Sequence, residues 1–385
     1  MEEWKEYKLG ELSIGKGSYG IGASAVPYSP SLHTYLRITD INDDGTLNKN
    51  GLMSLDDENA DDYILQPNDI VFARTGNSTG RSYFYDGSDG KLVYAGFLIK
   101  FSLDSKKVNP RILKYYTHSK PYFDWVRSFD TGGTRGNINA KTYGDMPIVL
   151  PPRNLQDKIV SILKSLDDKI EINRKINENL KQQAQALFKS WFVDFEPFKN
   201  GEFVESELGM IPKGWRVGTL DDLLEIKYGK DHKKLSDGKI PVYGSGGLMR
   251  RVDKSLYKGE SVLIPRKGTL NNVMYVNEEF WTVDTMFYTI PKVEHIALFC
   301  YLFLLGKDLA SMNAGSAVPS MTTEILNSMP VVIPQNSIVN EFDNVISSYF
   351  RKIENNDNES RRLASLRDTL LPKLMSGELK VNEIA

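Results

Sequence analysis

The sequence contains one cysteine, Cys300, and only four histidines in 385 residues. A single thiol cannot form an internal disulfide, and its apolar neighbours in Leu298–Leu305 indicate a buried small hydrophobe rather than a nucleophile. The histidines have no metal-ligand spacing. The chain also lacks a phosphate-binding lysine loop, a methyltransferase Asn/Asp-Pro-Pro-Tyr motif, a serine–histidine pair and a nuclease carboxylate cluster. We therefore expect a non-catalytic chain that binds no metal.

Targeting and membrane segments are also missing. No N-terminal signal peptide is apparent, and no apolar run approaches the roughly 18 residues needed to span a bilayer. We expect a cytoplasmic protein with no membrane partner. The hydrophobic content of 41% supports two or more domains with cores of their own.

Residues 15–20 match the dinucleotide-binding pattern G-x-G-x-x-G. Such a site needs a helix directly after the glycines, because the pyrophosphate lies at the helix N-terminus. Gly22, Pro27 and Pro30 prevent that helix. We interpret the segment as a turn or a loop near DNA, with Lys16 as a candidate contact.

The chain contains an internal repeat. Residues 146–151, Met-Pro-Ile-Val-Leu-Pro, recur at 329–334 as Met-Pro-Val-Val-Ile-Pro, so that Met146 corresponds to Met329. A weaker match opens each half, where Trp4 corresponds to Trp215. Two copies indicate an internal pseudo-two-fold, which suits a partner that is itself two-fold, such as duplex DNA.

The repeat includes two long helical patterns. From Asn154 to about Val193, apolar residues recur every three or four positions without an internal glycine or proline, and a second copy runs from Ile338 to Leu371. A helix of about 39 residues would be about 58 Å long, and its single apolar stripe needs a partner helix. We predict that the two helices pack on each other; two core helices of separate domains are the alternative.

Polar residues and helix-stop signals refine this prediction. Asn173 and Asn356 occupy equivalent stripe positions, where buried polar residues fix the register. Pro372 and Gly377 are expected to end the second helix. If the helices are antiparallel, the tail after Gly377 returns close to the N-terminus.

The remaining segments resemble short strands and loops. Apolar runs such as Ile70–Ala73 and Leu92–Ile99 lie between turn residues, and Pro110–Arg127 fits one helix. We predict an α+β fold with two mixed α/β domains joined by two long antiparallel coiled-coil helices. The expected boundaries are 1–152 for the first domain, 153–200 for the first helix and its loop, 201–334 for the second domain, and 335–385 for the second helix and tail.

Charge is segregated, although the net charge is only −2. Residues 227–267 hold 11 Lys/Arg against 4 Asp/Glu, and residues 68–141 hold 12 against 6. Residues 40–62 hold 1 against 8. The two basic stretches are candidate phosphate-facing surfaces, with scattered solvated charge as the alternative.

Polar loops that contain glycine occur at equivalent positions in the two halves of the sequence. Arg74 and Gly76 follow one predicted strand, and Arg266 and Gly268 follow another with the same spacing. A second matched pair is 132–139 and 315–320. Arginine can bridge guanine O6 and N7, asparagine can bridge adenine N6 and N7, and glycine lets the backbone approach a base. Ordinary polar turns are the alternative for any single residue.

The candidate DNA-binding residues come from these loops and basic stretches. They are Lys16, Arg74, Thr75, Asn77, Ser78, Thr79, Arg81, Arg135, Asn137, Lys227, Lys230, Lys233, Lys234, Arg250, Arg266, Lys267, Thr269, Asn271 and Asn272. We expect Arg74 and Arg266 to read bases or anchor the loops beside them. Most of the lysines between 227 and 234, with Arg250, are expected to meet phosphates.

The chain resembles the specificity subunit of Type I restriction-modification systems. Residues 209–215 (Gly-Met-Ile-Pro-Lys-Gly-Trp) are similar to the family's opening to its second target-recognition domain. Residues 175–194 resemble its central helix, and residues 370–378 (Leu-Leu-Pro-Lys-Leu-Met-Ser-Gly-Glu) resemble its closing motif. One departure is that Val318 and Pro319 replace the Arg-Gly-Asn run that begins at Arg135.

The resemblance implies two target-recognition domains, each reading one half of a split target in double-stranded DNA. It implies that the helices set the length of the spacer between the two half-sites and dock two modification (adenine methyltransferase) subunits. Restriction (ATP-dependent translocase/endonuclease) subunits would then join this assembly. S-adenosylmethionine, ATP and Mg²⁺ would bind those partners, and this chain would bind no cofactor. A coiled-coil protein scaffold without DNA specificity is the alternative, and a stand-alone methyltransferase or nuclease is disfavoured by the missing motifs.

Overall fold

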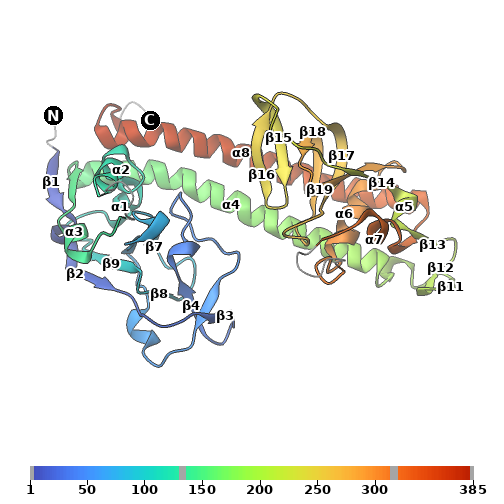
Figure 1. Ribbon diagram of the computed structural model, residues 1–385, viewed down its shortest axis with the longest axis horizontal. Coiled ribbons are helices and arrows are strands. Elements are labelled where there is room, and N and C mark those ends of the chain that lie inside the picture. The colour runs from blue at the N-terminus through green and yellow to red at the C-terminus, as the bar shows by residue number, and fades with distance from the viewer. Residues whose placement is uncertain (1–3, 130–135, 313–319, 382–385) are drawn as a thin grey trace. The chain divides into compact units, whose positions relative to one another are not determined.

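The computed structural model describes residues 4–129, 136–312 and 320–381. The chain forms two compact units (Figure 1): unit 1 comprises Met1–Glu171 and Glu359–Ala385, and unit 2 comprises Ile172–Asn358. Two helices contribute residues to both units, α4 (Arg153–Phe192, 40 residues) and α8 (Asn336–Ser376, 41 residues). Both long helices are therefore confirmed.

The described residues of unit 1 form three sheets. Strand β1 (Lys5–Lys8) pairs antiparallel with β10 (Pro147–Leu150). One four-stranded sheet has the order β2 (Ser13–Tyr19), β9 (Leu98–Leu103), β6 (Asp69–Ala73), β7 (Ser82–Tyr85). The other has the order β3 (Val26–Pro27), β5 (Met53–Leu55), β4 (His33–Leu36), β8 (Leu92–Tyr94). The helices are α1 (Pro110–Tyr116), α2 (Lys120–Arg127), α3 (Ala140–Gly144) and the 3-10 helices η1 (Leu9–Leu12), η2 (Ile38–Asp40), η3 (Ala60–Tyr63) and η4 (Gly76–Ser78).

Unit 2 is built around a six-stranded sheet. Its order is β14 (Leu224–Tyr228), β19 (Met286–Pro291), β17 (Tyr257–Pro265), β18 (Met274–Thr282), β15 (Asp237–Gly244), β16 (Gly247–Val252). The two-stranded pairs are β11 (Phe203–Ser206) with β12 (Gly209–Pro212), and β13 (Arg216–Thr219) with β20 (Pro330–Ile333). The helices are α5 (Leu220–Leu223), α6 (Ala297–Leu305), α7 (Thr323–Asn327) and the 3-10 helix η5 (Glu196–Phe198).

The repeat has the same backbone contacts in both units. Strand β1 pairs with β10 as β13 pairs with β20, and both pairs are antiparallel. The Leu9 N–H donates to the Met146 carbonyl at 3.1 Å, and the Leu220 N–H donates to the Met329 carbonyl at 2.9 Å. The order β2-β9-β6-β7 likewise corresponds to β14-β19-β17-β18. The internal repeat predicted from the sequence is confirmed.

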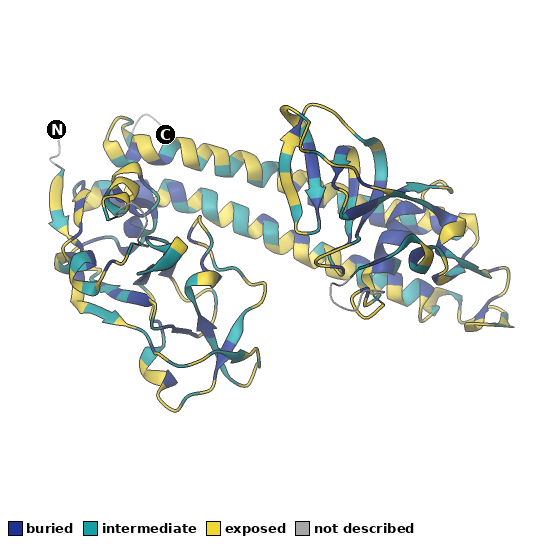
Figure 2. Cartoon of the chain, viewed as in Figure 1, coloured by how far each residue is buried: buried dark blue, intermediate teal, exposed yellow. Residues whose placement is uncertain are grey.

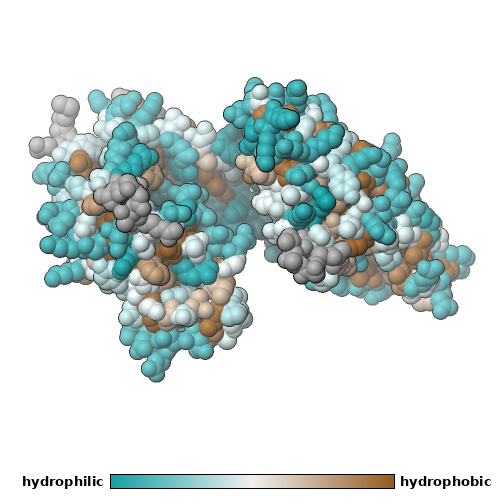
Figure 3. All heavy atoms as spheres, in the orientation of Figure 1, coloured by the Kyte–Doolittle hydropathy of each residue, from teal (hydrophilic) through white to brown (hydrophobic). Residues whose placement is uncertain are grey.

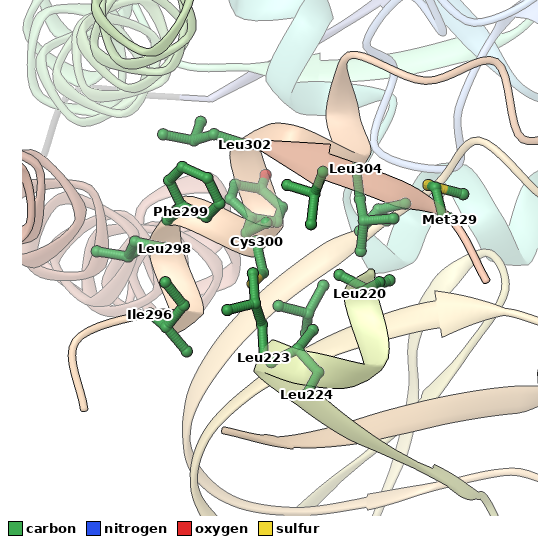
Figure 4. Close-up of a cluster of buried hydrophobic side chains, with 14 of the residues drawn as sticks. Leu220, Leu223, Leu224, Ile296, Leu298, Phe299, Cys300, Leu302, Leu304 and Met329 are labelled. Carbon is green, nitrogen blue, oxygen red and sulfur yellow. The ribbon is translucent and has the colours of Figure 1, made fainter. Parts of the chain in front are cut away.

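The core of unit 2 joins its sheet to the long helices. Helix α6 is almost entirely apolar and buried, so it packs on several sides at once. Figure 4 shows Cys300 of α6 among Leu220, Leu223 and Leu224. The thiol is free and buried, and burial raises its pKa. Cys300 is therefore a packing residue, as its neighbours in the sequence indicate.

The long helices pack antiparallel within unit 2 through buried amides. Asn356 Nδ2 donates to Asn177 Oδ1 at 2.8 Å, and Asn177 Nδ2 donates to Asp357 Oδ1 at 2.7 Å. Asn173 Nδ2 approaches the Asn356 carbonyl at 3.4 Å. Asn173 and Asn356 are both buried, so the predicted polar register positions are confirmed. Buried and exposed residues alternate along α4 and α8, as a single apolar stripe requires (Figure 2).

Within unit 1 the two helices meet at a charged cluster. Asp167 of α4 accepts hydrogen bonds from Arg367 Nη1 at 2.9 Å, from Lys114 Nζ at 2.8 Å and from the Tyr115 hydroxyl at 3.0 Å. Burial by itself raises the pKa of Asp167, but the two cations outweigh it and hold that pKa below its usual value. Gly377, beyond the end of α8, lies against the Trp4 ring, so the C-terminal tail does return to the N-terminal segment.

Two expectations about helices are wrong. The segment 110–127 forms α1 and α2 rather than one helix, because in one continuous helix the Pro121 ring would clash with the carbonyl four residues earlier. Pro372 does not end α8, which continues to Ser376. Its neighbours Leu371 and Leu374 are buried in the unit 1 core and hold the last turns, and Gly377, with φ +74°, terminates the helix.

The expected turn or loop at residues 15–20 is also wrong, because these residues belong to β2 and its end. Gly15 has φ +75° at a break in the strand register, and a Cβ on Gly17 would lie 2.5 Å from the Phe101 ring. The glycines therefore serve a bulge and a close packing contact. No helix in the described part of the chain is long and apolar enough to cross a lipid bilayer.

Candidate nucleic-acid interface

The first recognition loop begins where β6 ends. Arg74 follows Ala73, and Gly76, with φ +78°, turns the chain into η4. The Thr79 hydroxyl closes the loop by donating to the carbonyls of Gly76 at 2.8 Å and Gly136 at 3.0 Å. This loop is therefore held against the segment that begins at Gly136, which lies beyond α2 in the chain.

Backbone contacts fix the same two loops together. The Ile138 N–H donates to the Arg74 carbonyl at 2.9 Å, and Thr75 forms a β-bridge with Asn137. Asn137 is exposed beside Thr75. The structure therefore brings Arg74, Thr75 and Asn137 to one place in unit 1.

Unit 2 has the equivalent arrangement. The Met321 N–H donates to the Arg266 carbonyl at 2.9 Å, and Lys267 forms a β-bridge with Ser320. Gly268 has φ +83°, as Gly76 has a positive φ in unit 1. In each unit these contacts join the arginine loop to the described end of the second matched loop, at Asn137 in unit 1 and at Ser320 in unit 2.

The two arginines also share a neighbour on the adjoining strand. The Arg74 N–H donates to the Phe97 carbonyl at 3.1 Å, and the Arg266 N–H donates to the Thr285 carbonyl at 2.8 Å. Phe97 and Thr285 directly precede the equivalent strands β9 and β19. The N–H and the carbonyl of each arginine are thus both hydrogen-bonded, which fixes the position of its Cα atom and the direction in which its side chain leaves the backbone.

Each guanidinium lies over a tyrosine ring. Arg74 Cζ is 5.1 Å from the centre of the Tyr19 ring, and Arg266 Cζ is 5.3 Å from the centre of the Tyr228 ring. Both arginines are half-buried, and the tyrosines are 41% and 51% exposed. Among the described residues neither guanidinium has a carboxylate partner, and the buried Arg74 Nε makes no hydrogen bond.

Two other candidate arginines have partners within the chain. Arg81 pairs with Asp43 at 2.6 Å and donates to the Ile41 carbonyl at 3.3 Å. Arg250 pairs with Asp237 at 3.2 Å and donates to the Leu235 carbonyl at 2.8 Å. These bonds hold neighbouring segments of the chain together, so both arginines stabilise the fold, a role that the sequence did not indicate.

The candidate lysines divide into paired and unpaired groups. Lys227 pairs with Glu225 at 2.5 Å. In the described part of the chain, no ion pair engages the exposed side chains of Lys16, Lys230, Lys233, Lys234 and Lys267. The Trp281 Nε1 donates to the Lys230 carbonyl at 2.8 Å and fixes the start of this basic segment. Hydrophilic side chains cover most of the nearby β15–β16 hairpin (Figure 3).

The remaining candidates are polar residues of the loops. Asn77 and Thr269 are exposed, and Ser78 is half-buried. Asn271 bonds to Asp308 at 3.0 Å, and Asn272 Nδ2 donates to the Ser245 carbonyl at 2.7 Å. Arg135 and residues 315–319 lie outside the described residues. Within the described ranges, no group of three or more His, Cys, Asp or Glu residues could hold a metal ion.

Tyr19 and Tyr228 were not among the residues predicted from the sequence. A signal was present, because each is followed by glycine and each comes at a similar distance after the tryptophan that opens its half, Trp4 or Trp215. Their relation to the two arginines depends on the order of strands in each sheet, in which β9 or β19 separates the tyrosine strand from the arginine strand.

The chain is similar to known specificity proteins over nearly its whole length. A family model described as the Type I restriction modification DNA specificity domain matches residues 1–182 and 212–367. The MjaIX Type I restriction enzyme specificity subunit of Methanocaldococcus jannaschii is 30% identical over 300 residues, which cover 71% of this chain and 69% of that protein. The HindI specificity subunit of Haemophilus influenzae is 24% identical, with 98% and 100% covered.

A solved structure has the same fold. The crystal structure of the Type-I restriction-modification system S subunit from M. genitalium superposes with a TM-score of 0.55. The two chains are 18% identical, and the match covers 97% of this chain and 96% of that chain. The predicted α+β architecture with long helices is therefore confirmed.

Proposed function

Because this chain belongs to the Type I restriction-modification DNA specificity family, we propose that its two units read the two halves of a bipartite DNA target. DNA sequence recognition is the general role of the family. The division of that role between the units is our proposal. In it, the Arg74 loop reads the first half-site and the Arg266 loop reads the second.

One observation carries this proposal: both units present an arginine loop that is held by the same backbone contacts. Arg74 and Arg266 each accept a hydrogen bond from a second polar loop and donate one to the residue before an equivalent strand. Equivalent loops at equivalent places suit two contacts with one duplex. The loops differ in sequence, so we expect the two half-sites to differ.

The lysines without an ion-pair partner among the described residues support separate roles for the two kinds of cation, one binding phosphates and the other binding bases. Tyr228, the residue that packs on Arg266, is followed closely in the sequence by three of these lysines, Lys230, Lys233 and Lys234. Exposed ammonium groups suit phosphate contacts, which position a protein on DNA without reading its sequence. We assign these lysines to the backbone and the two arginines to bases.

We further propose that α4 and α8 set the distance between the half-sites and dock two modification subunits. Each helix is continuous and contributes to both units, so the helix pair is the part of the chain that can control spacer length. Restriction subunits would join this assembly in the cytoplasm. In the proposal, the chain itself is non-catalytic, and S-adenosylmethionine, ATP and Mg²⁺ bind the partner subunits.

The test is binding of the chain, loaded with its modification subunits, to duplexes altered in one element at a time. Scrambling either half-site should weaken binding by about tenfold or more, and changing the spacer should weaken binding while both half-sites are intact. Binding should also fall steeply as salt rises. Binding that is unaffected by scrambling one half-site would contradict bipartite reading.

A further inference from the structure

Tyr19 and Tyr228 occupy equivalent positions at the ends of β2 and β14, the strands that neighbour β9 and β19. Resting on the proposed function, we propose that these tyrosines are positioning residues for base recognition. Each holds its arginine ready to bind the O6 and N7 atoms of a guanine. On this basis, each half-site contains one guanine that depends on an arginine–tyrosine pair.

The backbone fixes each tyrosine through the glycine that follows it. The Gly20 N–H donates to the Leu98 carbonyl at 3.2 Å, and the Gly229 N–H donates to the Met286 carbonyl at 2.9 Å. A Cβ on Gly20 would lie 2.2 Å from the Tyr94 carbonyl oxygen, and a Cβ on Gly229 would lie 2.0 Å from the Val283 carbonyl oxygen. Only glycine permits this close backbone approach.

The tyrosine rings are anchored on the other side as well. The Tyr19 hydroxyl accepts a hydrogen bond from the Ala140 N–H at 3.1 Å, at the start of α3. This bond links Tyr19 to the loop that contains Asn137. In unit 2 the Tyr228 ring packs edge-on against Phe287 at 5.0 Å between ring centres. Each ring is therefore a fixed platform, although part of it is accessible to solvent.

The arginines above these platforms keep most of their hydrogen-bond donors for an external acceptor. Among the described residues, Arg74 donates no side-chain hydrogen bond, and Arg266 donates one, from Nη1 to the Asp284 carbonyl at 3.3 Å. Arg81 and Arg250 are neutralised by Asp43 and Asp237, whereas Arg74 and Arg266 lie on tyrosines without a carboxylate partner among the described residues. A ring attracts the cation through its π-face but occupies none of the N–H groups. The planar guanidinium then matches the paired acceptors of guanine better than any other base edge.

Stacking on a fixed ring should raise affinity by limiting the conformations of a long side chain before DNA binds. Removing the ring should therefore act through the arginine and affect one half-site. This distinguishes a positioning role from a general effect on folding, which would weaken both half-sites together.

The experiment uses the chain with its modification subunits and the target sequence mapped for the wild type. Each target guanine is replaced in turn by 7-deazaguanine, which lacks the N7 acceptor. Wild-type complex should bind about tenfold more weakly when one particular guanine in each half-site is replaced. Tyr19→Leu should weaken cognate binding several-fold and abolish the sensitivity in the first half-site only, and Tyr228→Leu should do so in the second.

Controls separate the ring from its surroundings. Tyr228→Phe keeps the ring and should keep the guanine sensitivity. Tyr19→Phe keeps the ring but loses the bond from the Ala140 N–H, so it should keep the sensitivity with a smaller loss of affinity than Tyr19→Leu. Tyr28→Leu removes an exposed tyrosine, 56% accessible, that is not stacked on an arginine and should change nothing. Tyr19→Ser gives a second ring deletion if the leucine variant does not fold.

The outcomes distinguish this inference from the proposed function. If Arg74→Ala abolishes the guanine sensitivity but Tyr19→Leu and Tyr19→Ser retain it at wild-type affinity, the tyrosine has no positioning role and the bipartite proposal stands. If Arg74→Ala and Arg266→Ala leave every guanine response unchanged, both the inference and the assignment of base readers fail.

Discussion

Asn356 Nδ2 of α8 donates a hydrogen bond to Asn177 Oδ1 of α4 at 2.8 Å, and both side chains are buried. Asn356→Leu should leave the Asn177 amide without this partner in an apolar setting and cost about 1–3 kcal/mol of stability. The measurement is thermal or denaturant unfolding of the full chain.

The double variant Asn177→Leu/Asn356→Leu provides the control. Replacing both partners by apolar side chains should recover much of the lost stability, because no amide of this pair is then left unsatisfied. A single variant as stable as the wild type would show that the amide pair does not contribute as its geometry indicates.

Asp167 should make a large, pH-dependent contribution to unit 1. Asp167→Asn removes the charge that pairs with both Lys114 and Arg367 in a mostly buried site, so it should cost about 3 kcal/mol at neutral pH. Asp168→Asn is the matched control, because Asp168 is half-exposed and its pair with Lys164 should contribute below about 1 kcal/mol.

The pH dependence follows from the lowered pKa of Asp167. A carboxyl whose folded-state pKa lies below its unfolded value, about 3.9, stabilises the fold fully above that value. The stabilisation is lost as pH falls through the folded-state pKa. The stability difference between wild type and Asp167→Asn should therefore shrink on acidification below about pH 4, and an increase in that difference would contradict the assignment.

The glycine after Tyr228 should resist substitution. Gly229→Ala places a Cβ 2.0 Å from the Val283 carbonyl oxygen, and a backbone atom there cannot move without disturbing the turn into β19. We expect a loss of about 1–3 kcal/mol by unfolding measurements. Gly246→Ala is the control, because no atom lies within 4 Å of its Cβ position. Equal effects of the two variants would contradict the proposed close approach.

The lysines after Tyr228 should contact phosphates. Lys233 is exposed and unpaired within the described residues, so Lys233→Ala should weaken binding to all DNA sequences about equally and reduce the salt slope by about one. Lys258→Ala should leave the slope unchanged, because Lys258 pairs with Glu279 at 2.8 Å at the opposite end of β17 from Arg266. A changed base preference in Lys233→Ala would instead make Lys233 a reader.

The features that depend on sequence period were predictable. The three-four stripe identified α4 and α8, and the internal repeat located the paired loops around Arg74 and Arg266. Proline was harder to interpret. Pro121 separates two helices where one was expected, whereas Pro372 lies inside α8 because buried leucines on either side hold the last turns.

The side-chain partners in the candidate site were not predictable from one sequence. Arg81 and Arg250 look like loop cations until folding brings Asp43 and Asp237 beside them. The pairing of Arg74 with Tyr19 requires the strand order β2-β9-β6, since the strands that carry them are not adjacent. Strand order within a sheet depends on long-range packing that local periodicity does not specify.

Half-site selection by Arg74→Ala and Arg266→Ala complexes tests the central claim most directly. Each complex is used to select duplexes from a library with both half-sites randomised, and the recovered sequences are compared with those of the wild type. We expect Arg74→Ala to relax the preference in the first half-site and leave the second intact, with the reverse for Arg266→Ala and a cost of about 1–3 kcal/mol on each cognate half-site. Relaxation of the same half-site by both variants, or uniform weakening with no change in preference, would contradict bipartite reading by these two arginines.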